Sequence, residues 1–180
     1  MNPEPSGEQV ARQTGDVHAR LTEVSTLHHT GYTVSDLERS LRFYRDLLGC
    51  TVVATQEKRG GYLADMVGYP DAHVRMAHLR APESEQIIEL FEYVTPAPER
   101  LRLEPRNVGI THLCFLVYDL KATYQRLLDA GVEFYSPPVE IDTGINTGGR
   151  ALYLRDPDQI TVELFERPTS QGTKSTARKR

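Results

Sequence analysis

The middle of the sequence is duplicated, and this duplication constrains the fold more than any other feature. A His-x4-Val-x-Asp-Leu pattern begins at His29 and again at His112. A second landmark, Glu-Leu-Phe-Glu, begins at Glu89 and again at Glu163. Two copies are too few for a solenoid. We therefore predict two related modules within one domain.

Each copy predicts the same order of elements, namely a strand, a helix and three further strands. The expected strands are residues 27–34, 51–56, 74–80 and 86–93 in the first copy, and 110–118, 132–135, 151–155 and 160–166 in the second. The first helix is expected to begin with a capping box between Ser35 and Glu38 and to end at Gly49, and the second to end at Gly131. The predicted fold class is α+β, with two tandem βαβββ modules.

The changes in composition along the chain predict where the domain begins and ends. It is expected to span residues 23–167, with module one at about 27–94 and module two at about 109–167. Residues 1–22 and 168–180 are polar and lack a hydrophobic period, so we expect them to be tails, the second of them basic.

Composition also excludes several classes of protein. The chain is 39% hydrophobic and 26% charged, as globular domains are. A formal net charge of −4 offers no general attraction to nucleic acid or to an anionic membrane. There is no apolar membrane span and no secretory signal, and two cysteines cannot make a disulfide framework. We therefore expect a cytoplasmic protein whose partner is a small-molecule substrate.

The duplicated landmarks point to metal chemistry. Because side chains alternate along a strand, Glu89 shares a sheet face with Ile87 and Phe91, and Glu163 shares one with Thr161 and Phe165, so both carboxylates are expected to be partly buried. A buried carboxylate needs a cation, a proton or several donors. Matching His and Glu residues in both halves indicate one shared partner, and two imidazoles with two carboxylates suit a divalent ion such as Co, Ni, Mn, Zn or Fe.

Further motifs surround these landmarks, namely Phe43-Tyr44 with Leu48-Gly49 in the first helix and Asp156-Pro157-Asp158 before Val162-Glu163-Leu164. With the duplicated patterns, they resemble the vicinal oxygen chelate superfamily of glyoxalase, bleomycin resistance and extradiol dioxygenase proteins. The resemblance covers about residues 27–167 and is nearest in ligand set to glyoxalase I and to methylmalonyl-CoA or cyclitol-ketone epimerases.

The resemblance implies a metal site that curved mixed sheets enclose, with ligands at His29, Glu89, His112 and Glu163. It also implies a homodimer. The sequence leaves open whether the site forms within one chain or across the dimer. One departure is Gln159, where the family usually has Gly. If that position requires a positive φ, a non-Gly residue costs roughly 1 kcal/mol.

Other histidines near the expected site allow more than one interpretation. His28 faces the opposite side of its strand and becomes a ligand only if the strand bulges. His73 and His78 stand on opposite faces of one strand, where surface or core placement competes with an acid–base role. Tyr153 is one of several tyrosines that could contact substrate.

Two cysteines and two loops also allow alternatives. Cys50 and Cys114 are expected to be packing residues, although Cys114 faces the pocket by alternation. Residues 143–149 form either a flap over the site or a connector. Residues 60–75 supply apolar side chains that could close a pocket on a small ligand: Tyr62, Met66 and Tyr69.

The function predicted from these residues is that of a metal-dependent epimerase or isomerase. A metal-bound carbonyl stabilises the enolate or enediolate that forms when the neighbouring carbon loses a proton. Glu89 and Glu163 are expected to move that proton, and the resemblance to glyoxalase I implies that they also remain ligands. The substrate is expected to be a small hydroxyketone or an acyl-CoA.

Three alternatives remain at this point. A glyoxalase-type lyase would use the same four ligands. An Fe(II) extradiol dioxygenase needs two His and one carboxylate, so the additional Glu89 counts against it. A non-catalytic small-molecule-binding protein is disfavoured by the intact ligand set.

Overall fold

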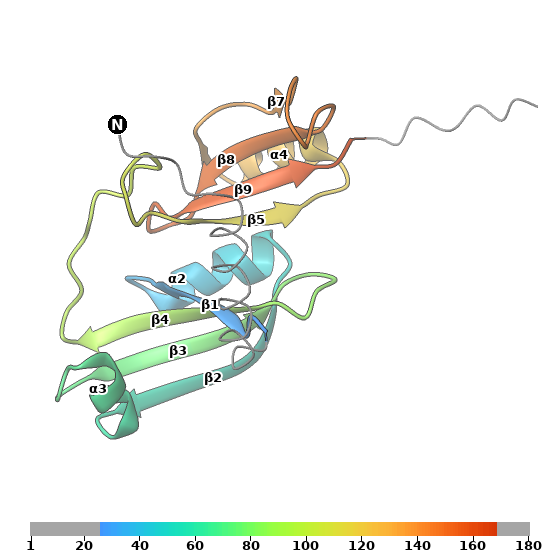
Figure 1. Cartoon of the computed structure of the whole chain (residues 1–180). Coiled ribbons are helices and arrows are strands. Elements are labelled where there is room, and N and C mark those ends of the chain that lie inside the picture. Colours follow the sequence, from blue (N-terminus) through green and yellow to red (C-terminus); the bar gives the residue numbers. More distant parts are fainter. Residues whose placement is uncertain (1–25, 169–180) are drawn as a thin grey trace, which may run out of the picture.

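The computed structural model describes residues 26–168, which form two modules (Figure 1). Module one contains β1 (His29–Thr33), α2 (Leu37–Leu41), the π-helix η2 (Arg42–Leu47), β2 (Thr51–Arg59), α3 (Tyr62–Val67), β3 (His73–Arg80) and β4 (Ile87–Thr95). Module two contains β5 (His112–Leu116), α4 (Leu120–Asp129), β6 (Glu133–Phe134), β7 (Val139–Glu140), β8 (Arg150–Arg155) and β9 (Thr161–Glu166). The predicted tails, 1–22 and 168–180, lie outside the described residues except for residue 168.

Each module builds one mixed sheet. The strand order is β1-β4-β3-β2 in module one and β5-β9-β8-β6 in module two, where the short β7 also pairs with β8. The first strand of each module runs parallel to the last, and the other pairs are antiparallel. The predicted α+β class with two βαβββ modules is thus confirmed, with α3 and β7 as additions that the sequence pattern did not predict.

Helices α2 and α4 begin in the same way. Asp36 is the N-cap of α2, and its side chain accepts a hydrogen bond from the backbone N–H of Arg39 at 2.9 Å. Asp119 caps α4 equivalently, accepting from the N–H of Ala122 at 2.9 Å. The capping box expected between Ser35 and Glu38 is wrong, because the Ser35 hydroxyl donates to Asp158 of module two instead.

A glutamate near the end of each last strand holds the adjacent helix start. Glu92 accepts from the N–H of Leu37 at 3.4 Å, and Glu166 accepts from the N–H of Leu120 at 2.7 Å. Both sites also carry an arginine, since Arg75 donates to Glu92 and Arg150 donates to Glu166. These bonds satisfy helix N–H groups that have no partner within the helix.

The first helix ends where the sequence predicts. It continues from α2 through η2, and Gly49 follows with φ +78°, the left-handed conformation that glycine adopts at low cost. Gln159, in the turn before β9, also has a positive φ, +70°. The family's usual glycine at that place therefore has a conformational reason, and this chain accepts the strain.

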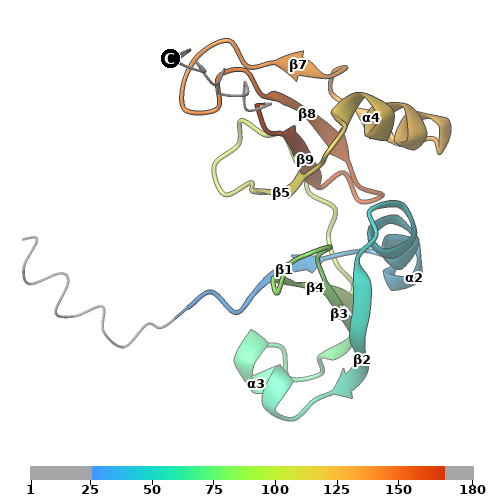
Figure 2. The same ribbon diagram turned by 90° about the vertical axis from the view of Figure 1, so that its right-hand side faces the viewer.

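The two modules share one hydrophobic core. It contains Leu41 and Tyr44 from the first helix together with Leu127 and Leu154 of module two. In Figure 1 the sheets lie one above the other with α2 between their levels, and in Figure 2 α2 and α4 lie on the same side of the molecule. The helices therefore cover one face of each sheet.

Equivalent turns of the two modules reach across the boundary between them. The β8–β9 turn of module two contacts module one: Asp158 accepts from the backbone N–H of Ser35 at 2.9 Å and from Arg39 at 2.7 Å. The β3–β4 turn of module one contacts module two, where Glu83 accepts from the hydroxyl of Tyr118 at 2.6 Å.

Candidate metal centre

The structure places one His–Glu pair on each sheet, where the first and last strands of the module run parallel. His29 Nε2 lies 3.2 Å from Glu89 Oε2 in module one. His112 Nε2 lies 3.0 Å from Glu163 Oε2 in module two. The strand registers are equivalent, because Gly31 pairs with Glu89 and Cys114 with Glu163. Because these strands are neighbours, each histidine lies beside the glutamate of its own module.

The carboxylates are more buried than the imidazoles beside them. Glu89 is only 7% exposed, and Glu163 is half-buried. The side chains of His29 and His112 are 42% and 43% exposed. Each pair thus presents an open imidazole and a sheltered carboxylate on a sheet. Desolvation of such a carboxylate must be offset by a proton or a cation nearby.

The four predicted ligands form two pairs in one chain, and they do not form a single cluster. Among residues 26–168, no group of three or more His, Cys, Asp or Glu side chains is placed to hold one ion. The donor chemistry nevertheless fits a divalent metal, because each pair supplies one imidazole nitrogen and one carboxylate. One chain therefore provides two half-sites, and a centre of four ligands requires that half-sites meet.

The surroundings of the two carboxylates differ. Glu89 is contacted by a second imidazole, since His78 Nε2 on β3 lies 2.6 Å from Glu89 Oε1. Tyr153 of β8 occupies the equivalent register position in module two, opposite Glu163. Its ring lies 5.1 Å from that of His112. The histidine at position 78 is thus the clearest difference between the half-sites.

Neither cysteine is activated. Burial raises the pKa of Cys114 to about 12, with contributions from the charge of Glu163 and from a hydrogen bond to it. Burial alone raises the pKa of Cys50 to about 11. Both thiols therefore stay protonated near neutral pH and give no nucleophile. Cys50 is buried in the core, as expected of a packing residue, whereas Cys114 is exposed, so its expected packing role is wrong.

The other histidines near the expected site differ in their distance from the His29–Glu89 pair, which we call half-site one; the His112–Glu163 pair is half-site two. His28 precedes β1, and its Nδ1 lies 2.7 Å from Nδ1 of His29. His73 contacts Glu57 at 2.7 Å, a pair unrelated to Glu89. Of the two histidines on β3, only His78 reaches a predicted ligand.

The α3 segment stands over one end of the first sheet. Leu63 and Val67 pack against Met76 and Phe91 in a small second cluster. Tyr62 and Met66 point outward and are largely exposed. The expected closure of a pocket by this insert is therefore not seen within one chain. In the loop of residues 143–149, Ile145 is fully exposed.

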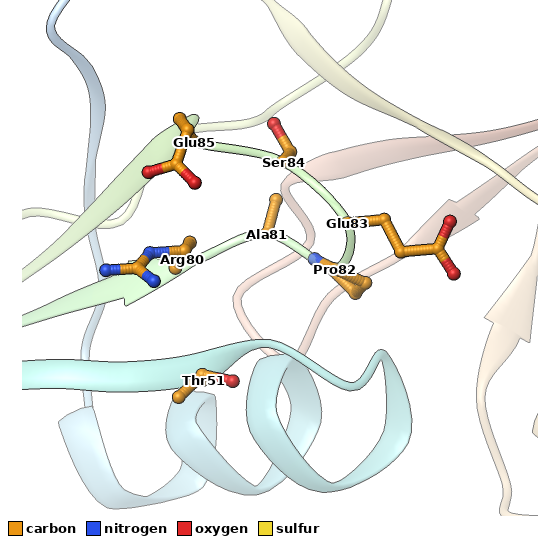
Figure 3. Close-up of a pocket in the computed structure, with 7 residues that line it drawn as sticks. All are labelled: Thr51, Arg80, Ala81, Pro82, Glu83, Ser84 and Glu85. Carbon is orange, nitrogen blue, oxygen red and sulfur yellow. The ribbon is translucent and has the colours of Figure 1, made fainter.

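Two hollows in the surface lie apart from the His–Glu pairs. One, of about 370 Å³, surrounds the β3–β4 turn (Figure 3), and its lining consists of Thr51 and residues 80–85. The other, of about 710 Å³, lies along α4 and includes Asp119, Tyr124 and Arg150. Neither contains one of the four predicted ligands.

Sequence reasoning missed the polar contacts that join the modules. Asp156 Oδ1 accepts from the N–H groups of Asp158 and Ile160 at 2.8 Å each, and Oδ2 accepts from the Tyr44 hydroxyl at 3.1 Å. Burial raises the pKa of Asp156 to about 6 despite these donors. The Asp156-Pro157-Asp158 motif is the sequence signal for this turn.

A search of the described segment for membrane-crossing helices finds none of sufficient length and apolarity.

Curated relatives and solved structures are similar to this chain over most of its length. It is 32% identical to the uncharacterized protein YwkD of Bacillus subtilis, covering 79% of this chain and 98% of YwkD. It is also 32% identical to 2-epi-5-epi-valiolone epimerase of an Actinomyces species, covering 79% of each. A glyoxalase family protein from Bacillus cereus has a similar structure, with TM-score 0.71 at 20% identity, over 81% of this chain and 96% of that one.

A family model matches most of the chain. The model for the glyoxalase/bleomycin resistance protein/dioxygenase superfamily matches residues 26–164, which include both His–Glu pairs. Members of this superfamily commonly bind a divalent metal ion, and many are enzymes. The chain, with its duplicated βαβββ modules, belongs to the glyoxalase/bleomycin resistance protein/dioxygenase superfamily.

Proposed function

We propose that this protein is a divalent-metal-dependent epimerase or isomerase that moves a proton at a carbon beside a carbonyl group. The observation that carries the proposal is the pair of equivalent His–Glu contacts, one in each module. The valiolone epimerase relative supports a small hydroxyketone of the cyclitol kind as substrate, with an acyl-CoA as the second choice.

The metal would be held by His29 and Glu89 of one half-site and by His112 and Glu163 of the other. When bound, such an ion stabilises the negative charge that develops on a substrate carbonyl oxygen. The imidazoles are neutral donors and the carboxylates supply two negative charges, so the filled site is close to neutral. Its remaining coordination positions are then available to two neighbouring substrate oxygens.

The two carboxylates would carry out the proton transfer. One takes the proton from the carbon beside the carbonyl, and the other returns a proton to the opposite face, so that the configuration inverts without net loss of a proton. They suit this division because they come from different modules.

We further propose that two copies of the chain complete the centre. One chain offers two half-sites on separate sheets, and both imidazoles are accessible. A twofold dimer in which half-site one of each copy faces half-site two of the other gives two equivalent four-ligand centres. The alternative is a movement of the modules of one chain toward each other.

A complementation experiment distinguishes these two assemblies. His29→Ala and His112→Ala chains are each expected to be inactive alone. If centres form between copies, a mixed dimer has one centre with both substitutions and one intact centre. Random mixing should then restore about a quarter of native activity. If centres form within one chain, no intact centre arises, and the absence of recovery in verified mixed dimers would contradict the dimeric site.

The reaction itself is tested by metal analysis and isotope exchange. Protein purified without added metal should contain a first-row divalent ion in near-stoichiometric amount. In D₂O, a cyclitol ketone substrate should gain deuterium at the carbon beside its carbonyl without consuming O₂. Absence of metal and of exchange would refute the proposal. Oxygen uptake with catechols would indicate a dioxygenase, and turnover of a glutathione hemithioacetal would indicate a lyase.

A further inference from the structure

The two half-sites are equivalent in backbone but unequal in what contacts the carboxylate. Position 78 of β3 pairs in register with Glu89, and position 153 of β8 pairs in register with Glu163. Module one has histidine at this place and module two has tyrosine. His78 contacts its carboxylate partner directly, with 2.6 Å between His78 Nε2 and Glu89 Oε1.

This distance requires a proton between the two atoms. A bare ring nitrogen and a carboxylate oxygen both present lone pairs, and these repel at such a separation. The other ring nitrogen of His78, Nδ1, is buried and has no hydrogen-bond partner. A proton placed on Nδ1 would be a buried donor without an acceptor, while Nε2 would be left facing a carboxylate. The geometry therefore favours a proton on Nε2, donated to Oε1 of Glu89.

We propose that His78 is a positioning residue for Glu89, an inference that rests on the proposed metal centre. His78 engages Oε1, so Oε2 is the oxygen that faces His29. Glu89 is thereby held as a donor of one oxygen in one orientation. Glu163 has no corresponding histidine, and its second contact is the weaker hydrogen bond of the Cys114 thiol. The two carboxylates of the centre therefore differ in the group that orients them.

The mechanism by which His78 would act is familiar from metal sites in general. Groups that orient a ligand without touching the metal change metal affinity by about 10- to 100-fold when they are removed. His78 is also well placed for this role mechanically, because it lies on the strand next to β4 and its side chain is only 23% exposed. A short, rigid connection between neighbouring strands keeps Glu89 in one rotamer.

The experiment compares metal affinity in three variants. The amide of His78→Gln extends about as far as Nε2 and should retain the contact, whereas the amide of His78→Asn is too short. His73→Asn is the matched control, because His73 lies on the same strand and also contacts a glutamate, but away from Glu89. Chelator competition with Ni²⁺ or Co²⁺ should show affinity lowered about 10-fold or more by His78→Asn only. Native affinity in His78→Asn would overturn the proposal.

A second measurement does not depend on metal or on the stability of a variant. Long-range ¹H–¹⁵N NMR of the metal-free protein reports which nitrogen of His78 carries the proton. An Nε2–H tautomer is expected, and an Nδ1–H tautomer would overturn the positioning role. If the wild-type protein binds no divalent ion, the proposed function fails, and the tautomer then decides by itself whether His78 holds Glu89.

Discussion

The two modules are most alike where a helix is docked on its sheet and least alike around the carboxylates and in the turns between modules. Glu92 and Glu166 hold equivalent helix starts, each with an arginine beside it. In contrast, His78 of module one is replaced by Tyr153 in module two. Helix docking satisfies backbone groups that any copy of the module must satisfy, so it persists after duplication. Residues around a site have no such common constraint.

The turns show the same divergence. The β8–β9 turn is anchored in module one by two half-buried or buried aspartates, Asp156 and Asp158. The equivalent β3–β4 turn reaches module two through the exposed hydrogen bond from Tyr118 to Glu83 and borders the hollow in Figure 3. Of the two turns, that of module two therefore makes the more buried polar contacts with the other module. Substitutions at matched positions of the two modules should therefore have unequal effects.

The largest expected effect is on catalysis. Glu163→Gln removes a proton-transfer carboxylate from the module-two half-site and should lower turnover by about 10²–10⁴-fold while the fold is retained. The rate of deuterium incorporation from D₂O measures this, with the thermal midpoint as a check on folding. The matched control is Glu140→Gln on β7, which is exposed. Native turnover in Glu163→Gln would remove the carboxylate from the mechanism.

The next effect concerns the pH dependence of stability. In the unfolded chain Asp156 loses its proton near its ordinary pKa of 3.8, whereas burial in the folded state raises that pKa to about 6. Between these values the folded state binds more protons, so the free energy of unfolding should fall as pH rises from about 4 to about 6, by up to about 3 kcal/mol.

Urea titrations across this pH range measure that dependence. The Asp156→Asn side chain cannot ionise, so the unfolding free energy of this variant should depend less on pH. Module one has Ala81 at the corresponding turn position, which has no titratable group. Equal slopes in the two proteins would place the pH dependence elsewhere.

Replacing the residue through which each turn contacts the other module should lower the unfolding free energy by unequal amounts. Burial acts to raise the pKa of Asp158, but hydrogen bonds from Ser35 and the charge of Arg39 outweigh it and lower that pKa. Asp158→Ala should therefore cost about 2 kcal/mol of unfolding free energy. Glu83→Ala, on the exposed side, should cause no measurable change. Urea denaturation at pH 7 decides, and comparable losses would mean that both turns anchor the modules.

The smallest expected effect is conformational. Gln159 has φ +70°, so Gln159→Gly should relieve backbone strain and raise the unfolding free energy by up to about 1 kcal/mol. The gain is limited, because glycine gains flexibility in the unfolded chain and the contact from Arg155 is lost. Differential scanning calorimetry can detect it. A clear loss of stability would show that the side-chain contact outweighs the strain.

Local rules predicted much of the fold and of each half-site. Alternation along strands gave the strand face on which each of the four predicted ligands lies. It did not predict that β1 lies beside β4 and β5 beside β9, which is what brings each histidine to the glutamate of its module. The helix end at Gly49 followed from its freedom to adopt positive φ. The helix start was mispredicted because Ser35 is held by Asp158, a residue far away in sequence.

The sequence by itself determined the duplicated modules, the family and the four matched His and Glu positions, since these depend on spacing within a strand and on repeated residue types. Only the tertiary structure decided which residues connect the modules and which group stands opposite each carboxylate. It also decided that one chain presents two half-sites in place of a closed cluster. The physical reason is that neighbours across a sheet or a module boundary are chosen by packing and strand register, and neither can be read from local periodicity.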